Sequence, residues 1–360
     1  MNGRNKDFIV IGAGIIGLAT AERLLAQGAA VTVLERGAVG QESSWAGGGI
    51  LSPLCPWDYP DEVTRLTSHS ATIFAAWAAG LQAASGIDTE YEMSGMLVLP
   101  PFDAQVAQQW CAAHQVTLCP ASAADYALPI HGDVLYLPQV AQVRNPRLLR
   151  ALRSRVETLG GRIVEQCAVR GIEAGNGYVQ MLATSTGAYR AENYIVTAGA
   201  WSKQVLGQHA LQLDIKPMRG QMLLFKFAVP PLRHIVVQED LYLIPRRDGH
   251  LLVGSTLEDV GFDKQTTRVA RDNLFKRAQN VLPQLHDMPV LQQWAGLRPA
   301  SPRNIPTIAR HPQLDNLYIN SGHFRYGVTM APASVEILLN EMTGAPQPFD
   351  VAPYRAGWGA

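Results

Sequence analysis

The sequence predicts an α/β fold in which a discontinuous nucleotide-binding domain carries an inserted β-rich α+β domain. A β-α-β unit opens the chain, with a buried strand at 7–11, a helix over 15–27 and a second strand at 30–35. Strand–helix pairs of the same kind recur in the middle and near the end. A β-rich block occupies 212–262 between them. We therefore expect the chain to leave one nucleotide-binding domain and later return to it.

Length and charge set limits on what the chain can be. Its 360 residues are enough for about two domains. Thirty basic residues balance thirty acidic ones, so no electrostatic argument favours nucleic acid or an anionic membrane surface as a partner. The longest later apolar run, 71–81, is too short to span a bilayer. We expect no nucleic-acid partner and no membrane.

Cysteine and histidine usage argues against a metal site. The four cysteines form no C-x-x-C pair, and the nine histidines show no clustering typical of ligands. The apolar start at 8–21 resembles a secretory signal, but it continues into a helix and a second strand, which a signal peptide does not need. We expect a cytoplasmic protein with free thiols and no metal.

The first third of the chain is predicted to be mainly helical after its opening unit. A polar, glycine-rich loop covers 37–49, and helices follow over 61–84 and 103–114. The segment 91–100 is predicted to be a strand. Several prolines make 116–140 look irregular.

A well-delimited helix then begins at Asn145. Asn145 is the predicted N-cap, Pro146 takes the first helical position, and Gly160 follows the last turn.

The remaining elements alternate between strands and helices. Short strands lead into "VTAGAWS" (196–202), and Asp248-Gly249 predicts a hairpin turn. A helix is expected over 267–281, a last core strand at 317–320 and a closing helix over 328–342.

The opening unit contains a Rossmann-like glycine motif. Gly12, Gly14 and Gly17 have the G-x-G-x-x-G spacing, in which the glycines allow a tight turn, close approach of a pyrophosphate, and close packing of helix on strand. The helix N-terminus then offers free N–H groups to phosphates. Glu35 ends the second strand, where a carboxylate can accept hydrogen bonds from ribose hydroxyls. The pattern predicts FAD or NAD rather than NADP.

Four further segments resemble motifs of one flavoprotein family. They are "ESSWAGGGILSP" (42–53), "VTAGAWS" (196–202), "GLRPASP" (296–302) and "SGHFRYGVTMAP" (321–332). Their order and spacing across nearly the whole chain resemble the D-amino acid oxidase (DAO) superfamily and, within it, the bacterial glycine oxidases. The late turn has no cysteine where sarcosine-oxidase relatives bind FAD covalently, so the resemblance implies noncovalent FAD.

The resemblance implies a DAO-type architecture with a discontinuous Rossmann-like FAD-binding domain. We expect this domain to comprise 1–85, 140–210 and 296–360, and a substrate-binding domain to comprise 86–139 and 211–295. It also implies a homo-oligomer.

The implied activity is oxidative deamination of glycine, sarcosine and small D-amino acids. A hydride passes to flavin N5, water hydrolyses the imine to the oxo acid (glyoxylate) and ammonia, and dioxygen is converted to hydrogen peroxide. No general base is expected if the substrate amine binds in its neutral form. The resemblance further implies a role in thiamine (thiazole) biosynthesis.

The substrate's carboxylate suggests its own binding residues. A planar guanidinium matches a carboxylate with two parallel hydrogen bonds. Arg298 in "GLRP" matches the family's carboxylate-binding arginine, and Tyr242 in "LYLIPR" matches a tyrosine that contacts the same group. The resemblance places Arg325 at the flavin and the substrate, just before a helix whose N-terminus stabilises negative charge on the flavin.

The expected cofactor contacts come from the glycine motif, the loop after the second strand, the middle segment and the late turn. They are Gly12, Gly14, Ile15, Ile16, Gly17, Glu35, Arg36, Ser43, Ser44, Trp45, Ala46, Gly47, Gly48, Val169, Ala198, Gly199, Trp201, Arg298, His323, Phe324, Arg325, Tyr326, Gly327, Val328 and Thr329.

Two positions depart from the family's pattern. Asp240 stands where one glycine oxidase pattern has histidine, and Leu257 stands where it has methionine. We expect Asp240 near the entrance and Leu257 as an apolar wall. We expect Arg219 in a loop that is a candidate for approaching the flavin. Arg246 and Arg247 flank the hairpin turn and are expected to be solvated.

Other interpretations remain open at this stage. Within the same superfamily, the chain could be a D-amino acid dehydrogenase or a sarcosine/proline-type oxidase, and release of peroxide distinguishes an oxidase from a dehydrogenase. An interpretation of a different class is a nonenzymatic flavin- or NAD-binding module. The arginines disfavour that interpretation because a binding module needs no carboxylate clamp.

Overall fold

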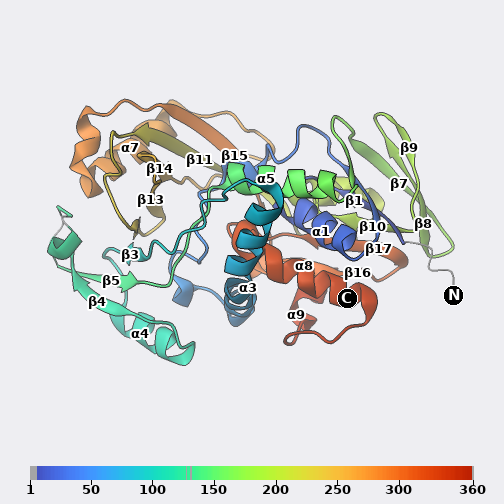
Figure 1. Ribbon diagram of the computed structural model, residues 1–360, viewed down its shortest axis with the longest axis horizontal. Helices are drawn as coiled ribbons and strands as arrows, with labels where there is room; N and C mark the ends of the chain where they lie inside the picture. Colours follow the sequence, from blue (N-terminus) through green and yellow to red (C-terminus); the bar gives the residue numbers. More distant parts are fainter. Residues whose placement is uncertain (1–5, 127, 130–131, 359–360) are drawn as a thin grey trace.

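The computed structural model describes residues 6–126, 128–129 and 132–358. Figure 1 shows α1, α3, α5 and α8 grouped near the centre of the molecule, with α7 at one end beside β13 and β14. The helices are α1 (Ile15–Ala26), α2 (Ser43–Ala46), α3 (Asp61–Ser85), α4 (Ala104–Ala113), α5 (Asn145–Thr158), α6 (Ser202–Leu206), α7 (Arg268–Val281), α8 (Gly327–Thr343) and α9 (Ala352–Arg355).

A six-stranded sheet contains the opening β-α-β unit. In spatial order its strands are β16 (Thr307–His311), β17 (Leu314–Ser321), β10 (Asn193–Val196), β1 (Asp7–Ile11), β2 (Ala30–Leu34) and β6 (Arg162–Val164). Neighbours from β17 to β6 are parallel, and β16 adds an antiparallel edge. Parallel sheets are covered on both faces, which explains the nearly continuous apolar sequence of β1.

The two faces of this sheet have different covers. Phe8 and Val10 of β1 belong to a core that also contains buried side chains of α1, α3, α5 and α8. Ile9 and Ile11 point to the other side and pack with Val179 of a small sheet. That three-stranded sheet consists of β7 (Val169–Gly175), β8 (Tyr178–Thr184) and β9 (Gly187–Tyr189).

The β-rich part is an eight-stranded, mainly antiparallel sheet. In spatial order its strands are β15 (Gln292–Ala300), β11 (Lys216–Lys226), β14 (His250–Gly254), β13 (Leu241–Pro245), β12 (Ile235–Gln238), β3 (Met96–Val98), β5 (Asp133–Leu137) and β4 (Cys119–Ser122). Only the β3–β12 pairing is parallel among these described strands. Leu274 and Ala278 of α7 pack on this sheet against Leu223 and Phe225.

The predicted α/β fold class is confirmed. The hairpin turn at Asp248-Gly249 joins β13 to β14, and Gly249 has a φ of +83°, which glycine adopts without strain. The predicted helices over 61–84, 103–114 and 267–281 correspond to α3, α4 and α7.

Three local predictions were wrong. The strand expected over 91–100 is confined to β3. The segment 116–140, expected to be irregular, contributes β4 and β5, because pairing with the neighbouring strand outweighs the low strand propensity of its prolines. Asn145 is the first helical residue rather than the N-cap, since its side-chain amide donates to the carbonyls of Ser44 and Gly47.

The chain passes between the two large sheets four times. It enters the eight-stranded sheet at β3, returns at β6, leaves again at β11 and returns at β16. The boundary predicted between residues 295 and 296 lies inside β15, and the division into two domains stays a prediction. In the described part of the chain, no helix is both long and apolar enough to cross a membrane.

Candidate functional site

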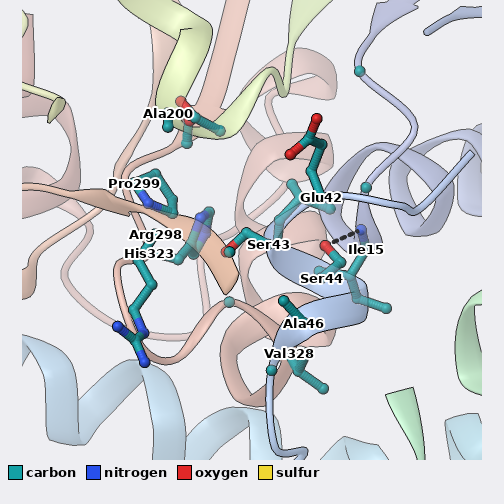
Figure 2. Close-up of a pocket in the computed structure, with 18 of the residues that line it drawn as sticks. Ile15, Glu42, Ser43, Ser44, Ala46, Ala200, Arg298, Pro299, His323 and Val328 are labelled. Atoms are coloured by element: carbon teal, nitrogen blue, oxygen red, sulfur yellow. Dashed lines mark hydrogen bonds between the residues drawn. The ribbon is translucent and has the colours of Figure 1, made fainter. Parts of the chain in front are cut away.

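A cavity of about 380 Å³ lies where the two large sheets meet. Figure 2 shows Ile15, at the start of α1, facing Ser44 of α2, with Arg298 and His323 on the opposite side of the pocket. Most of the predicted site residues line it: Gly12, Gly14, Ile15, Ile16, Glu35, Arg36, Ser43, Ser44, Ala46, Gly47, Gly48, Val169, Ala198, Gly199, Trp201, Tyr242, Arg298, His323, Phe324, Arg325, Tyr326, Gly327, Val328 and Thr329.

Two predicted cofactor residues, Gly17 and Trp45, are not part of the lining. Gly17 lies behind it, where a Cβ would come within 1.9 Å of the Gly12 carbonyl oxygen. Trp45 packs edge-on against Trp294, with ring centroids 5.7 Å apart. Both residues therefore support the cavity wall from behind.

The glycine motif forms the nucleotide end of the cavity. Gly12 has a φ of +108°, and a Cβ there would lie 2.7 Å from the Thr197 carbonyl oxygen. Gly14 precedes α1 and offers no side-chain cap, and the Ile15 N–H donates to Ser44 Oγ at 2.9 Å. The helix thus begins at the cavity wall with its positive dipole end toward the cavity.

Glu35 is held rigidly at the end of β2. Its side chain is buried, and its carboxylate accepts hydrogen bonds from the Ala13 N–H at 2.8 Å and the Gly37 N–H at 2.9 Å. A carboxylate fixed in this way beside the glycine turn is positioned to accept hydrogen bonds from ribose hydroxyls. The nucleotide end therefore fits an adenine dinucleotide.

The loop after α2 brings bare backbone to the middle of the cavity. A Cβ on Gly48 would lie 2.4 Å from Ile244 Cδ1, and one on Gly49 would lie 2.1 Å from the Val143 carbonyl oxygen. At Gly49 the obstacle is backbone, so no side chain fits on that side, whereas at Gly48 the flexible end of the Ile244 side chain would have to shift. A flat ring system can lie directly against such a backbone, so the loop fits an isoalloxazine.

Arg246 corrects the prediction of a solvated hairpin. Its side chain is buried, and Nη2 donates to the Gly48 carbonyl at 2.6 Å. Nη1 donates to the Val143 carbonyl and to Gln142 Oε1, at 3.0 and 2.7 Å. Burial lowers the pKa of Arg246 to about 10, which leaves it charged at neutral pH. Arg247 is exposed, as expected.

Asn145 and Arg246 together fix the loop after α2. Asn145 holds the carbonyls of Ser44 and Gly47, and Arg246 holds that of Gly48. Sequence reasoning missed both roles. The asparagine was assigned to a helix cap and the arginine to a surface turn, and neither local pattern carries a signal for these distant partners.

Arg298 dominates the other end of the cavity. Nη2 donates to Ser255 Oγ at 2.6 Å and Nη1 to the Thr256 carbonyl at 3.1 Å. Both acceptors are neutral, so these bonds orient the guanidinium without neutralising it. Burial, and the nearby Arg325 charge, lower the pKa of Arg298. A half-buried cation with neutral partners favours binding of an anion.

Tyr242 and Arg325 complete this end. The Tyr242 hydroxyl donates to Met222 Sδ at 3.1 Å, a weak acceptor that a carboxylate could replace. The Arg325 guanidinium carbon lies 5.5 Å from the centroid of the Phe324 ring. The three predicted substrate residues therefore line one region of the cavity together with Met222 and Ser255, which sequence reasoning missed.

Two ionisable groups of the late turn, His323 and Tyr326, are neutral at physiological pH. Burial lowers the pKa of His323 to about 3, and its Nε2 lies 3.0 Å from Ser334 Oγ. Burial also raises the pKa of Tyr326 well above its usual value. Neither group has the pKa near neutrality that a general base requires.

Asp240, Leu257 and Arg219 lie outside the main lining. Leu257 is exposed and does not form an apolar wall. Arg219 does not reach the cavity, because it pairs with Glu258 and Asp263. Asp240 lines a second cavity of about 270 Å³ that shares Phe324 and Arg325 with the main one.

The part of the chain that the structure describes offers no candidate metal centre. Within the described ranges, no three histidine, cysteine, aspartate or glutamate side chains group in a way that could hold a metal ion. All four cysteines are free thiols.

Comparison with known proteins supports the geometry. The FAD dependent oxidoreductase (DAO) family matches residues 7–340. A glycine oxidase of Pseudomonas aeruginosa is 42% identical over 97% of this chain and 98% of its own length. The bifunctional protein ThiO/ThiG of a Nostoc species is 31% identical over 92% of this chain and 52% of its own length.

The crystal structure of glycine oxidase from Geobacillus kaustophilus has the same fold, with a TM-score of 0.90, 24% identity, and coverage of 97% of this chain and 98% of that one. The family match spans most of the described residues and includes both ends of the cavity. This chain is a member of the FAD dependent oxidoreductase family of D-amino acid oxidase type.

Proposed function

We propose that this protein is an FAD-dependent glycine oxidase. It converts glycine, and also sarcosine and small D-amino acids, to the oxo acid, ammonia or the corresponding amine, and hydrogen peroxide. The observation that carries the proposal is the half-buried guanidinium of Arg298, which has neutral partners and lies in the same cavity as the dinucleotide motif. The 42% identity to a glycine oxidase along nearly the full length of both chains supports this substrate class.

The residues that would hold FAD lie along the whole cavity. Glu35 and the start of α1 would bind the adenosine and pyrophosphate, and the loop from Gly47 to Gly49 would lie against the flavin ring. When bound, FAD would supply the hydride acceptor for the substrate carbon and the group that dioxygen reoxidises. We propose that it is held noncovalently. Cys167 lines the cavity beside the nucleotide end, where its Sγ lies 3.1 Å from the Thr186 hydroxyl. It therefore lies away from the loop that would contact the flavin ring.

The protein's own contribution is to bind and orient the substrate. Arg298 would bind the α-carboxylate in a bidentate manner, Tyr242 would donate a third hydrogen bond, and Arg325 would add positive charge. Holding the carboxylate at two or three points aims the α-carbon at one face of the cofactor, which converts an encounter into an oriented reaction. The neutral His323 and Tyr326 are consistent with a substrate amine that binds without a protein base.

The direct test is peroxide release in air by the purified yellow protein. Glycine, sarcosine, D-alanine, D-proline and L-alanine are compared at matched concentrations. We expect peroxide with glycine and the small D-substrates and none with L-alanine. Flavin bleaching without peroxide would instead indicate a dehydrogenase, and a colourless protein that binds NAD would contradict the proposal. Heating should release FAD into solution if it is held noncovalently.

The biological setting is also proposed. The similarity to a protein named ThiO/ThiG supports a role in supplying the thiazole unit of thiamine. A cytoplasmic location and a homo-oligomeric state remain proposals. A deletion strain that requires thiazole for growth, together with the mass of the protein in solution, would test the pathway and the oligomer.

A further inference from the structure

One surface segment touches both ends of the cavity. This segment, Ser255–Lys264, is called the strap here, and it follows β14 and precedes α7. At its start, Ser255 and Thr256 accept the hydrogen bonds of Arg298. At its end, the Lys264 ammonium lies 2.9 Å from Glu42 Oε2, at the nucleotide end. The strap therefore connects the substrate-binding arginine to the cofactor-binding loop.

A buried arginine anchors the middle of the strap. Arg219 of β11 has a side chain only 5% exposed, and it pairs with Glu258 at 2.6 Å and with Asp263 at 2.7 Å. The backbones of Arg219 and Glu258 also exchange two hydrogen bonds, each 2.9 Å long. Two charge-assisted bonds and a backbone pair fix this part of the strap to the eight-stranded sheet.

The outer contacts of the strap reach residues that line the cavity. The Phe262 ring packs on Trp201, with centroids 5.5 Å apart, and the Arg36 guanidinium lies 3.5 Å above the Trp201 ring. Glu42 pairs with both Arg36, at 2.6 Å, and Lys264. Arg36, Glu42 and Trp201 line the cavity, whereas Phe262 and Lys264 do not. The strap thus supports these lining residues from outside.

We propose that the strap retains the cofactor, with Phe262 and Lys264 as the residues that close it over the adenosine end. The inference rests on the proposed function, since it requires FAD in the cavity. For the dinucleotide to leave at this end, Trp201 and Glu42 must move, and the strap resists that motion. Phe262 is 40% exposed, so the strap can open without uncovering a large apolar surface.

The test measures FAD release rather than turnover. Holoenzyme carrying Phe262→Ala and Lys264→Ala together is diluted, and the rise of free flavin fluorescence gives the release rate. Loss of one aromatic contact and one exposed ion pair should raise the release rate and the dissociation constant about tenfold, or about 1.4 kcal/mol. Peroxide production at saturating FAD should be unchanged. Val260→Ala, an exposed substitution on the same strap, is the matched control and should release FAD at the native rate.

Salt provides a second readout that does not depend on the aromatic pair. Raising the ionic strength to about 0.5 M screens an exposed ion pair, so native FAD release should accelerate, while release from Lys264→Ala should change much less. The proposed role of the strap would be contradicted if the double variant released FAD at the native rate. It would also be contradicted if salt accelerated FAD release equally from the native protein and from Lys264→Ala. A native protein that binds no FAD would instead overturn the proposed function, so the two failures are distinguishable.

Discussion

At the nucleotide end of the cavity the shaping residues are neighbours in sequence, whereas at the substrate end they come from segments far apart in the chain. Gly12, Gly14 and Glu35 all belong to the opening β-α-β unit. Arg298 belongs to β15, Tyr242 to β13 and Arg325 to the turn before α8. A local motif can encode the first end, but only the completed fold assembles the second.

The two ends also use charge differently. At the nucleotide end, Glu35 is satisfied by two backbone N–H groups, and Arg36 is paired with Glu42. At the substrate end, Arg298 is bound only to neutral oxygens. The first arrangement is complete within the protein, while the second leaves a positive charge available to an incoming carboxylate. This contrast predicts separable effects of substitution.

The sharpest separation should come from Arg298→Ala. Loss of two charge-assisted hydrogen bonds, each worth about 1.5–3 kcal/mol, should lower kcat/KM for glycine by about 100-fold or more, mainly through KM. FAD should stay bound, because the nucleotide end is untouched. Steady-state peroxide assays and the flavin absorbance of the purified variant check both points. Arg247→Ala, at an exposed arginine of the hairpin, is the control. Loss of FAD from the Arg298→Ala variant would contradict the separation between the two ends of the cavity.

Gly17→Ala should affect the nucleotide end most. Its Cβ would meet the Gly12 carbonyl oxygen at 1.9 Å, so α1 must move away from the turn, at a cost of about 3 kcal/mol. Urea unfolding and FAD content measure this effect. Gly80→Ala is the matched control. Gly80 lies exposed within α3 with open space around it, and alanine there should stabilise the helix by about 1 kcal/mol. Equal stability of both variants would contradict the packing argument.

Arg246→Gln tests whether the middle of the cavity depends on a distant cation. Shortening this side chain removes the donors to the carbonyls of Gly48 and Val143, which should cost about 2 kcal/mol. The loosened loop should also alter the absorbance spectrum of bound flavin. Arg247→Gln, next in sequence but exposed, should change neither the urea midpoint nor the spectrum. If the two variants behave alike, Arg246 does not position the loop.

His323 gives an effect on stability that is absent near neutral pH and appears only as the pH falls. Its folded pKa of about 3 is below the ordinary value of 6.5, so the unfolded chain binds a proton that the folded protein excludes. The stabilisation is complete above pH 6.5 and is lost as the pH falls, by up to about 1.4 kcal/mol per pH unit for one proton. His323→Gln should therefore flatten the decline of the urea midpoint between pH 6 and pH 4. If the urea midpoint of the variant falls with pH as steeply as that of the native protein, His323 is not the group that binds this proton.

These contrasts also explain which features could be predicted from sequence. The glycine motif and Glu35 are predictable because spacing along a β-α-β unit determines their placement. Arg298 and Tyr242 could be proposed as substrate-binding residues only through resemblance, since nothing local distinguishes them. Arg246 and Asn145 were misassigned because their partners lie far away in the sequence, and a buried arginine beside a hairpin looks the same as a solvated one.

The four passages of the chain between its two large sheets constrain how the protein is made. At about 5–20 residues per second, a ribosome completes β17 tens of seconds after β1, the strand with which it shares a sheet. Arg298 and the turn before α8 emerge equally late, so the cavity wall is open through most of synthesis. Cofactor loading is therefore a step for the finished chain, and a nascent protein stalled before residue 330 would have a complete glycine motif but no site to fill.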